Sequence, residues 1–213
     1  MKAMSTLMNP QRPHLRRQAG AVRGWVIALI VVGVLILILI SSYTSGYNRI
    51  VALHERVKQQ WAQVDVVIQR RADLIPNLVA TVRGFAAHET KVIGEITSAR
   101  AALAGAQNRS QTIAANNQLD GALSRLLVVV ENYPNLKSNS NFLALQDELT
   151  GTENRIAVER HRYNTDIQAY NTYITQFPNN IIAGMSGFHY DSNYFNASPA
   201  ERAAPPKVKF GNP

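Results

Sequence analysis

Four polar residues that lie close together in the sequence are the first candidates for chemistry: Arg70, Arg71, Asp73 and His88. A pair of arginines can hold an anion, and an aspartate and a histidine can transfer protons. A hydrolase or a transferase could use these groups if the fold brought them together in one concave pocket. His88 also begins a partial H-E-x-x-H zinc motif, but the sequence reads HETKV and lacks the second histidine.

Other signatures of catalysis are missing from the sequence. Cysteine is absent, which excludes disulfides, thiolate metal sites and a cysteine nucleophile. No serine lies in a G-x-S-x-G turn, and the E-x-x-H pairs of di-iron helical bundles do not occur. We therefore expect a protein that is not an enzyme and has no catalytic, metal or cofactor site. An uncharacterised hydrolase or transferase built on the polar quartet is the alternative.

The net charge of +8 is distributed unevenly along the chain. Residues 1–24 hold five basic residues and no acidic residue, whereas positive and negative charges nearly balance in residues 47–178. A nucleic-acid-binding domain would concentrate basic residues on its folded part. We therefore expect no nucleic-acid partner, and we describe residues 1–23 as a basic N-terminal arm.

A continuous apolar run at residues 25–40 predicts a transmembrane anchor, which we place at residues 24–45. A helix of about 20 residues crosses a bilayer core of about 30 Å, and the uncharged stretch here is longer than that. A cleaved signal peptide is the rival interpretation, but its apolar region would be shorter, and no clear Ala-x-Ala cleavage site follows. The basic arm predicts a cytoplasmic N-terminus, with the remainder of the chain outside the membrane.

The remaining sequence has the periodicity of amphipathic helices, because apolar residues recur every seven positions. Turn residues divide residues 47–178 into four helices, at about 47–72, 73–103, 110–132 and 141–177. In this division Asp73 caps the second helix, and Pro76 lies in its first turn. Four helices with short connections predict an all-α, up-and-down bundle with coiled-coil-like packing.

A single kinked helix over residues 47–104 is an alternative, because the seven-residue phase continues across Pro76. It would pair with the third and fourth helices laid end to end. Such a two-helix rod would have to oligomerise, because it buries little apolar surface alone.

An antiparallel register between the first and last helices indicates which residues face each other. The register is set by placing Tyr47 opposite Phe177. Ile68 then meets Ile156, Trp61 meets Tyr163, and Arg71 meets Glu153. Arg71 interrupts an apolar row, and a buried arginine needs a carboxylate partner because an isolated buried charge is very costly. We therefore predict an ion pair between Arg71 and Glu153 that fixes the helix register.

Tyrosine–asparagine pairs recur in the sequence, and two of them, Tyr163-Asn164 and Tyr170-Asn171, are one heptad apart. We expect the tyrosine rings to pack between helices with their hydroxyls at the edge, and a polar stripe for a partner helix is the alternative. The charged residues of the same helix are expected to form a solvated face. These are Glu153, Arg155, Glu159, Arg160 and Arg162.

The character of the chain changes after Pro178, where helical periodicity ends. Residues 179–197 form an aromatic extension that could fold back onto the bundle or bind a partner. Residues 198–213 are rich in Ala, Pro and Lys, and we expect them to be disordered.

Two long blocks of sequence give a family resemblance. YNRIVALHERVKQQWAQVDVVIQRRADLIPNLVATVRGFAAHE, at residues 47–89, and FLALQDELTGTENRIAVERHRYNTDIQAYNTYITQFP, at residues 142–178, resemble the two blocks of the LemA family. The resemblance extends over residues 47–195. It implies a bacterial, membrane-anchored helical bundle of unassigned activity, it provides no catalytic residues to transfer, and it does not fix the orientation.

Together these features predict a single-pass protein of the bacterial inner or cell membrane that presents a helical scaffold to envelope proteins. Its expected contacts are the lipid bilayer, unidentified protein partners and, as a further option, a second copy of the chain. The residues expected to support the scaffold are Arg71, Glu153, Asp73, Pro76, Trp61, Tyr163 and Tyr170.

Overall fold

The computed structural model describes the backbone of residues 19–196 and the side chains of residues 24–196. The predicted basic arm (1–23) and disordered tail (198–213) therefore lie outside the side chains that are described. Within the described part the chain is helical and contains no strand, so the predicted all-α class is confirmed. The helices are α1 (Ala19–Phe85), α2 (Thr90–Ala104), α3 (Arg109–Val130), α4 (Pro134–Lys137), α5 (Ser140–Thr175) and α6 (Asn179–Met185).

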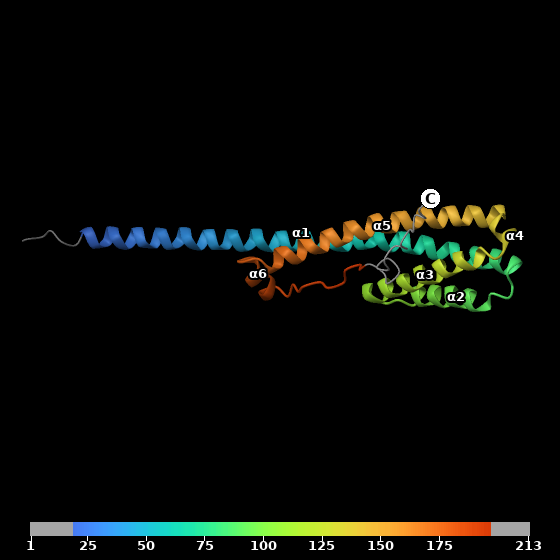
Figure 1. Ribbon diagram of the computed structural model, residues 1–213. Helices are drawn as coiled ribbons and strands as arrows, with labels where there is room; N and C mark the ends of the chain where they lie inside the picture. Colours follow the sequence, from blue (N-terminus) through green and yellow to red (C-terminus); the bar gives the residue numbers. More distant parts are fainter. Residues whose placement is uncertain (1–18, 197–213) are drawn as a thin grey trace, which may run out of the picture. The chain divides into compact units, whose positions relative to one another are not determined.

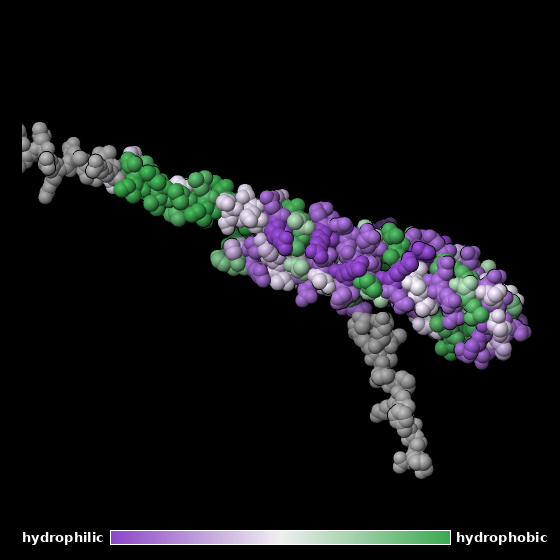
Figure 2. Space-filling model, turned by 90° about the horizontal axis from the view of Figure 1, so that it is seen from above, coloured by the Kyte–Doolittle hydropathy of each residue, from purple (hydrophilic) through white to green (hydrophobic). Residues whose placement is uncertain are grey.

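The chain divides into two compact units, Met1–Gly46 and Tyr47–Pro213, which we call the N-terminal segment and the helical domain. The large apolar side chains of residues 25–40 are exposed, and Figure 2 shows them as a continuous hydrophobic surface. By length and composition, α1 is a helix that could cross a membrane, and it is the one such helix in the described part of the chain. Exposed apolar side chains suit a lipid environment, because lipid tails are as apolar as they are.

The helical domain is built from the part of α1 after Gly46 together with α2, α3 and α5. Figure 1 shows α5 and the paired helices α2 and α3 beside this part of α1, with the short α4 leading into α5. Heptad spacing places one apolar row of each helix toward the others, and these rows form a single core. Its fully buried members include Val64, Ile68, Leu119, Leu126 and Ile156.

The predicted helix break at residues 72–73 is wrong, because α1 continues through Pro76 to Phe85. A proline inside a helix has no N–H to donate to the carbonyl four residues before it, here that of Ala72. Arg100 of α2 supplies the missing donor, with its Nε 3.1 Å from the Ala72 oxygen. The helix therefore passes the proline because another helix satisfies the carbonyl that proline leaves free.

Asp73 is consequently not a helix cap and Pro76 is not a first-turn residue. Asp73 lies inside α1, where its carboxylate accepts a hydrogen bond from Gln69 Nε2 at 2.8 Å. The single-helix alternative is also wrong in its end point, because α1 stops at Phe85 and a turn at residues 86–89 separates it from α2.

The predicted register between α1 and α5 is confirmed by three contacts. The rings of Trp61 and Tyr163 meet at 5.4 Å between centroids, and the Arg71 guanidinium lies 2.5 Å from the Glu153 carboxylate. His54 and Tyr170 also meet at 5.4 Å, and the residue numbers of all three pairs have the same sum. An antiparallel pair with one constant register requires this equality.

Candidate functional site

A buried ion network lies where α1, α3 and α5 meet. The guanidinium of Arg71 contacts the carboxylates of both Asp120 and Glu153, and Arg160 lies 3.0 Å from the second oxygen of Asp120. Asn116 donates a further hydrogen bond to Asp120 at 3.2 Å. Two positive and two negative groups therefore neutralise each other, which is how a helix seam tolerates buried charge.

Asp120 is the centre of this network, and the sequence analysis did not identify it. The Arg71 side chain is 6% exposed and that of Asp120 is 19% exposed, whereas Glu153 is 39% exposed. The predicted pair with Glu153 is present, but the more buried partner of Arg71 comes from α3. The prediction that Glu159 and Arg160 belong to a solvated face is also wrong, because only 18% and 11% of their side chains are exposed.

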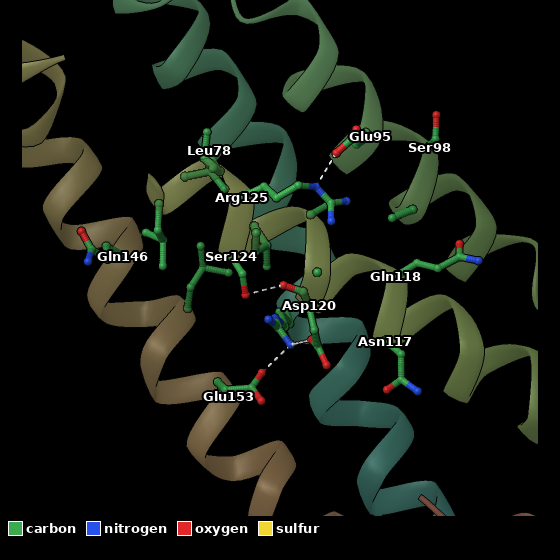
Figure 3. A pocket seen from close by; sticks show the side chains of 18 of the residues that line it. Leu78, Glu95, Ser98, Asn117, Gln118, Asp120, Ser124, Arg125, Gln146 and Glu153 are labelled. Carbon is green, nitrogen blue, oxygen red and sulfur yellow. Dashed lines mark hydrogen bonds and ion pairs between the residues drawn. The ribbon is translucent and has the colours of Figure 1, made fainter. Parts of the chain in front are cut away.

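A large open cavity adjoins the network, and we call it the α3 cavity. Its volume is about 1260 Å³, and it lies over α3 with walls from α1, α2 and α5. Figure 3 shows the Asp120 and Glu153 carboxylates converging at one side of it, and the Arg125–Glu95 pair, 2.6 Å apart, at another. Its apolar lining includes Leu78, Leu123, Leu126, Phe142 and Leu149.

Two glycines border the open space of the α3 cavity. Gly94 of α2 and Gly121 of α3 both line it. A Cβ atom added at Gly94 would meet no other atom within 4 Å, and at Gly121 the nearest is an Arg125 side-chain nitrogen at 3.5 Å. The oxygen of the Asn117 side chain is buried at the wall without a hydrogen-bond partner among the described residues. An unpaired buried acceptor beside an open cavity suits a donor from water or from a bound partner.

The polar quartet that could have formed an enzyme site does not converge. Arg71 is buried in the ion network, whereas Arg70, Asp73 and His88 are exposed. Nor do the described residues contain a group of three or more His, Asp or Glu side chains placed to hold a metal ion. The structure thus gives no support to the quartet as a catalytic constellation.

The aromatic extension folds back onto the helical domain. It begins with the helix α6 at Asn179–Met185, so the prediction that the helical pattern ends at Pro178 is wrong. Residues 188–196, which we call the strap, follow α6 without helical structure and are held by two asparagines of α5. Asn164 donates to the carbonyl of Phe195 at 2.8 Å and accepts from its N–H at 2.9 Å. Asn171 makes the same two bonds to Asp191, at 2.7 and 2.9 Å. The asparagines of the tyrosine–asparagine pairs therefore bind main-chain atoms of the strap.

Phe195 anchors the strap in an aromatic pocket. Its ring stacks on Trp61 at 6.0 Å and meets the edge of Tyr163 at 5.8 Å, and only 7% of Phe195 is exposed. The guanidinium of Arg160 lies 5.0 Å from the same ring. Since Arg160 also binds Asp120, one side chain joins the strap to the ion network.

Burial and charge set the acid–base behaviour of this region. Burial, and then the negative charge of Asp191, raise the pKa of Tyr163 to about 12. Burial also raises the pKa of Tyr170, whose hydroxyl donates to the His189 carbonyl at 3.0 Å. The pKa of His54 is lowered, first by burial and then by the charge of Lys58. The predicted packing of the Tyr163 and Tyr170 rings between helices is confirmed, but the hydroxyl of Tyr163 is buried and not at the edge. Near neutral pH both hydroxyls are protonated.

The fold and this site define a class: a helical domain that follows a membrane-type helix, closed by its own C-terminal strap. The profile of the LemA family matches residues 60–210, and the chain belongs to the LemA family.

The relatives include magnetosome protein MamQ 2 of Paramagnetospirillum magneticum, which is 31% identical over 84% of this chain and 75% of its own length. Magnetosome protein MamQ of Magnetospirillum gryphiswaldense is 28% identical over the same shares. Protein LemA of Metamycoplasma hominis is 22% identical over 75% of this chain and 73% of its own length.

Proposed function

We propose that this protein is a non-enzymatic, single-pass membrane scaffold that binds a protein partner in the α3 cavity. The cavity carries the proposal, because it is open to solvent and lined by apolar side chains, and exposed apolar surface of this extent marks an interaction site. Its apolar lining with charges of both signs near the edge matches the apolar centre and polar rim of protein interfaces. The relatives' names, magnetosome protein and protein LemA, state no catalytic activity.

Filling the cavity tests this proposal. Gly94→Leu should place a side chain in the open space beside α2 without a clash and should not weaken the helix, because glycine is a poor helix former. Gly84→Leu is the matched control, since Gly84 also lies in a helix with nothing within 4 Å but does not line the cavity. In-cell crosslinking and co-purification should recover a partner with the wild type and the control and lose it with Gly94→Leu.

An unchanged set of partners in both variants would remove the cavity from the proposal. The alternative, a hydrolase or a transferase, would be favoured if the wild type turned over a test substrate and if Arg70→Gln or His88→Gln lowered the rate of that reaction.

We further propose that residues 24–45 cross the bacterial inner or cell membrane with the helical domain on the outside. The five basic residues before the span support this orientation. Because the chain has no cysteine, Ser5→Cys and Ala104→Cys each give a single label site. A membrane-impermeant maleimide should label Ala104→Cys and not Ser5→Cys in intact cells, and the reverse pattern would overturn the orientation.

A further inference from the structure

An exposed apolar patch lies on and beside α6, and neither the ion network nor the α3 cavity includes it. It consists of Phe177, Ile181 and Met185, which are 81%, 53% and 75% exposed. The opposite side of α6 packs against the domain, because Ile182 and Ala183 are buried in its core. The patch is therefore an additional apolar face, which we call the α6 patch.

The sequence around the α6 patch is free of charge. Residues 167–190 contain no Asp, Glu, Lys or Arg, whereas residues 140–166 of α5 contain eight Asp, Glu and Arg residues. Tyr190, in the same stretch, is 60% exposed. Exposed tyrosine next to exposed apolar side chains is typical of surfaces that lie at the boundary between lipid and water.

Contacts within the helical domain place the α6 patch near Tyr47. Phe188 is the third residue after the end of α6, and its N–H donates to the Ala183 carbonyl at 3.0 Å. The ring of Phe188 meets the ring of Tyr47 at 6.0 Å. The patch is thus at the end of the domain where the chain enters from the N-terminal segment.

Chain connectivity then limits how far the bilayer surface can be from the patch. The proposed span ends at residue 45, and two residues of helix advance only about 3 Å. Whatever the arrangement of the two units, Tyr47 must lie close to the lipid headgroups. A surface next to Tyr47 that is apolar and uncharged avoids the cost of desolvating charge in that layer.

We propose that the α6 patch inserts into the interfacial layer of the bilayer and gives the helical domain a second membrane contact. This inference rests on the proposed anchor. A second copy of the chain is a poorer occupant, because a stable dimer buries about 800 Å² on each partner and three side chains provide much less. Interfacial insertion needs only apolar side chains that reach about 5–10 Å into the headgroup boundary.

Fluorescence of the full chain in phosphatidylcholine vesicles tests the inference. Met185→Cys, labelled with an environment-sensitive fluorophore, should show blue-shifted emission that spin-labelled lipid quenches and that aqueous iodide does not. Val128→Cys is the matched control, because Val128 is 72% exposed but lies near the C-terminal end of α3. Its label should be quenched by iodide and not by lipid.

A label at Leu35→Cys separates this inference from the anchor on which it rests. Lipid quenching at Leu35 with iodide quenching at Met185 would overturn the α6 contact and leave the anchor intact. Iodide quenching at both positions would overturn both. Protection of Met185 from both quenchers that disappears on dilution would show a second copy on the patch and would also overturn the inference.

Discussion

The hydrogen bond from Arg100 to the Ala72 carbonyl offers a sharp test of why α1 continues through Pro76. Met in place of Arg100 keeps most of the apolar stem and removes the donor. A hydrogen bond from a charged group contributes about 1.5–3 kcal/mol, so Arg100→Met should lower the free energy of unfolding by about 2 kcal/mol.

The same substitution should cost far less after Pro76→Ala. Alanine at position 76 has an N–H that can donate to the Ala72 carbonyl, so the guanidinium is no longer needed there. We expect the cost of Arg100→Met to fall to about 0.5 kcal/mol, which is a coupling of about 1.5 kcal/mol between the two sites.

Urea unfolding of the full chain in detergent micelles would measure this coupling. Trp61 reports on the helical domain once Trp25→Phe removes the other tryptophan. Arg155→Met is a suitable control, because Arg155 is exposed on α5 and should change stability by less than about 0.5 kcal/mol. An equal cost of Arg100→Met with proline and with alanine at position 76 would refute the explanation.

Three further predictions follow from the ion network and the strap. A double-mutant cycle between Arg71→Met and Asp120→Asn should give a coupling of about 1–3 kcal/mol in urea unfolding. The cycle between Arg71→Met and Glu153→Gln should give a smaller coupling, because Glu153 is more exposed. A larger coupling with Glu153 than with Asp120 would contradict the central place of Asp120. Phe195→Ala should destabilise the domain by about 3 kcal/mol and speed proteolysis of the strap, whereas Phe195→Leu should do so less, and equal effects would argue against aromatic packing. Burial lowers the pKa of His54, so the unfolded chain binds a proton at His54 more readily than the folded chain does. The stability that depends on neutral His54 is therefore complete above about pH 6.5 and is lost as the pH falls toward the folded pKa. Thermal melts should show a larger fall in Tm on acidification for the wild type than for His54→Gln, and equal falls would exclude His54 as the cause.

Heptad spacing was enough to predict the register of α1 and α5. The spacing is a local property of each helix, and once Tyr47 is placed opposite Phe177 the remaining pairs follow, including Trp61 with Tyr163. Phe177 itself lies beyond the end of α5 and is 81% exposed, so the register is correct although its starting residue is outside the helix. Arg71 could be matched with Glu153 for the same reason, because both lie on the two helices whose register was known.

The helix break and the centre of the ion network could not be predicted in this way. A proline after a possible cap is typical of the first turn of a helix, and the sequence gives no sign that α1 continues through Pro76. The donor that makes this possible, Arg100, is 28 positions from Ala72 on another helix. Asp120 is 49 positions from Arg71 in the sequence and lies on a third helix, α3. One signal was available, since Asp120 stands next to Leu119 on the apolar side of its helix and needed a cationic partner.

The tyrosine–asparagine pairs were recognised, but their partner was not. Nothing in a periodic pattern indicates that a side chain will bind the main chain of a segment without periodicity. Two asparagines seven positions apart on a helix are about 10 Å apart along its axis, and four residues of extended chain cover a similar distance. This match brings Asp191 and Phe195 to the two asparagines.

Asn164 and Asn171 bind main-chain atoms of the strap, and four of its side chains add contacts of their own to the helices. These are Phe188, Asp191, Tyr194 and Phe195. Gly187, with φ of +76°, forms the turn that delivers the strap from α6. A chain cut after this glycine and supplied with residues 188–196 as a separate peptide should therefore reassemble by fragment complementation, with these four residues as the selective positions. A fluorophore attached at one of the other positions of the peptide would turn the strap into an exchangeable probe for following assembly of the domain.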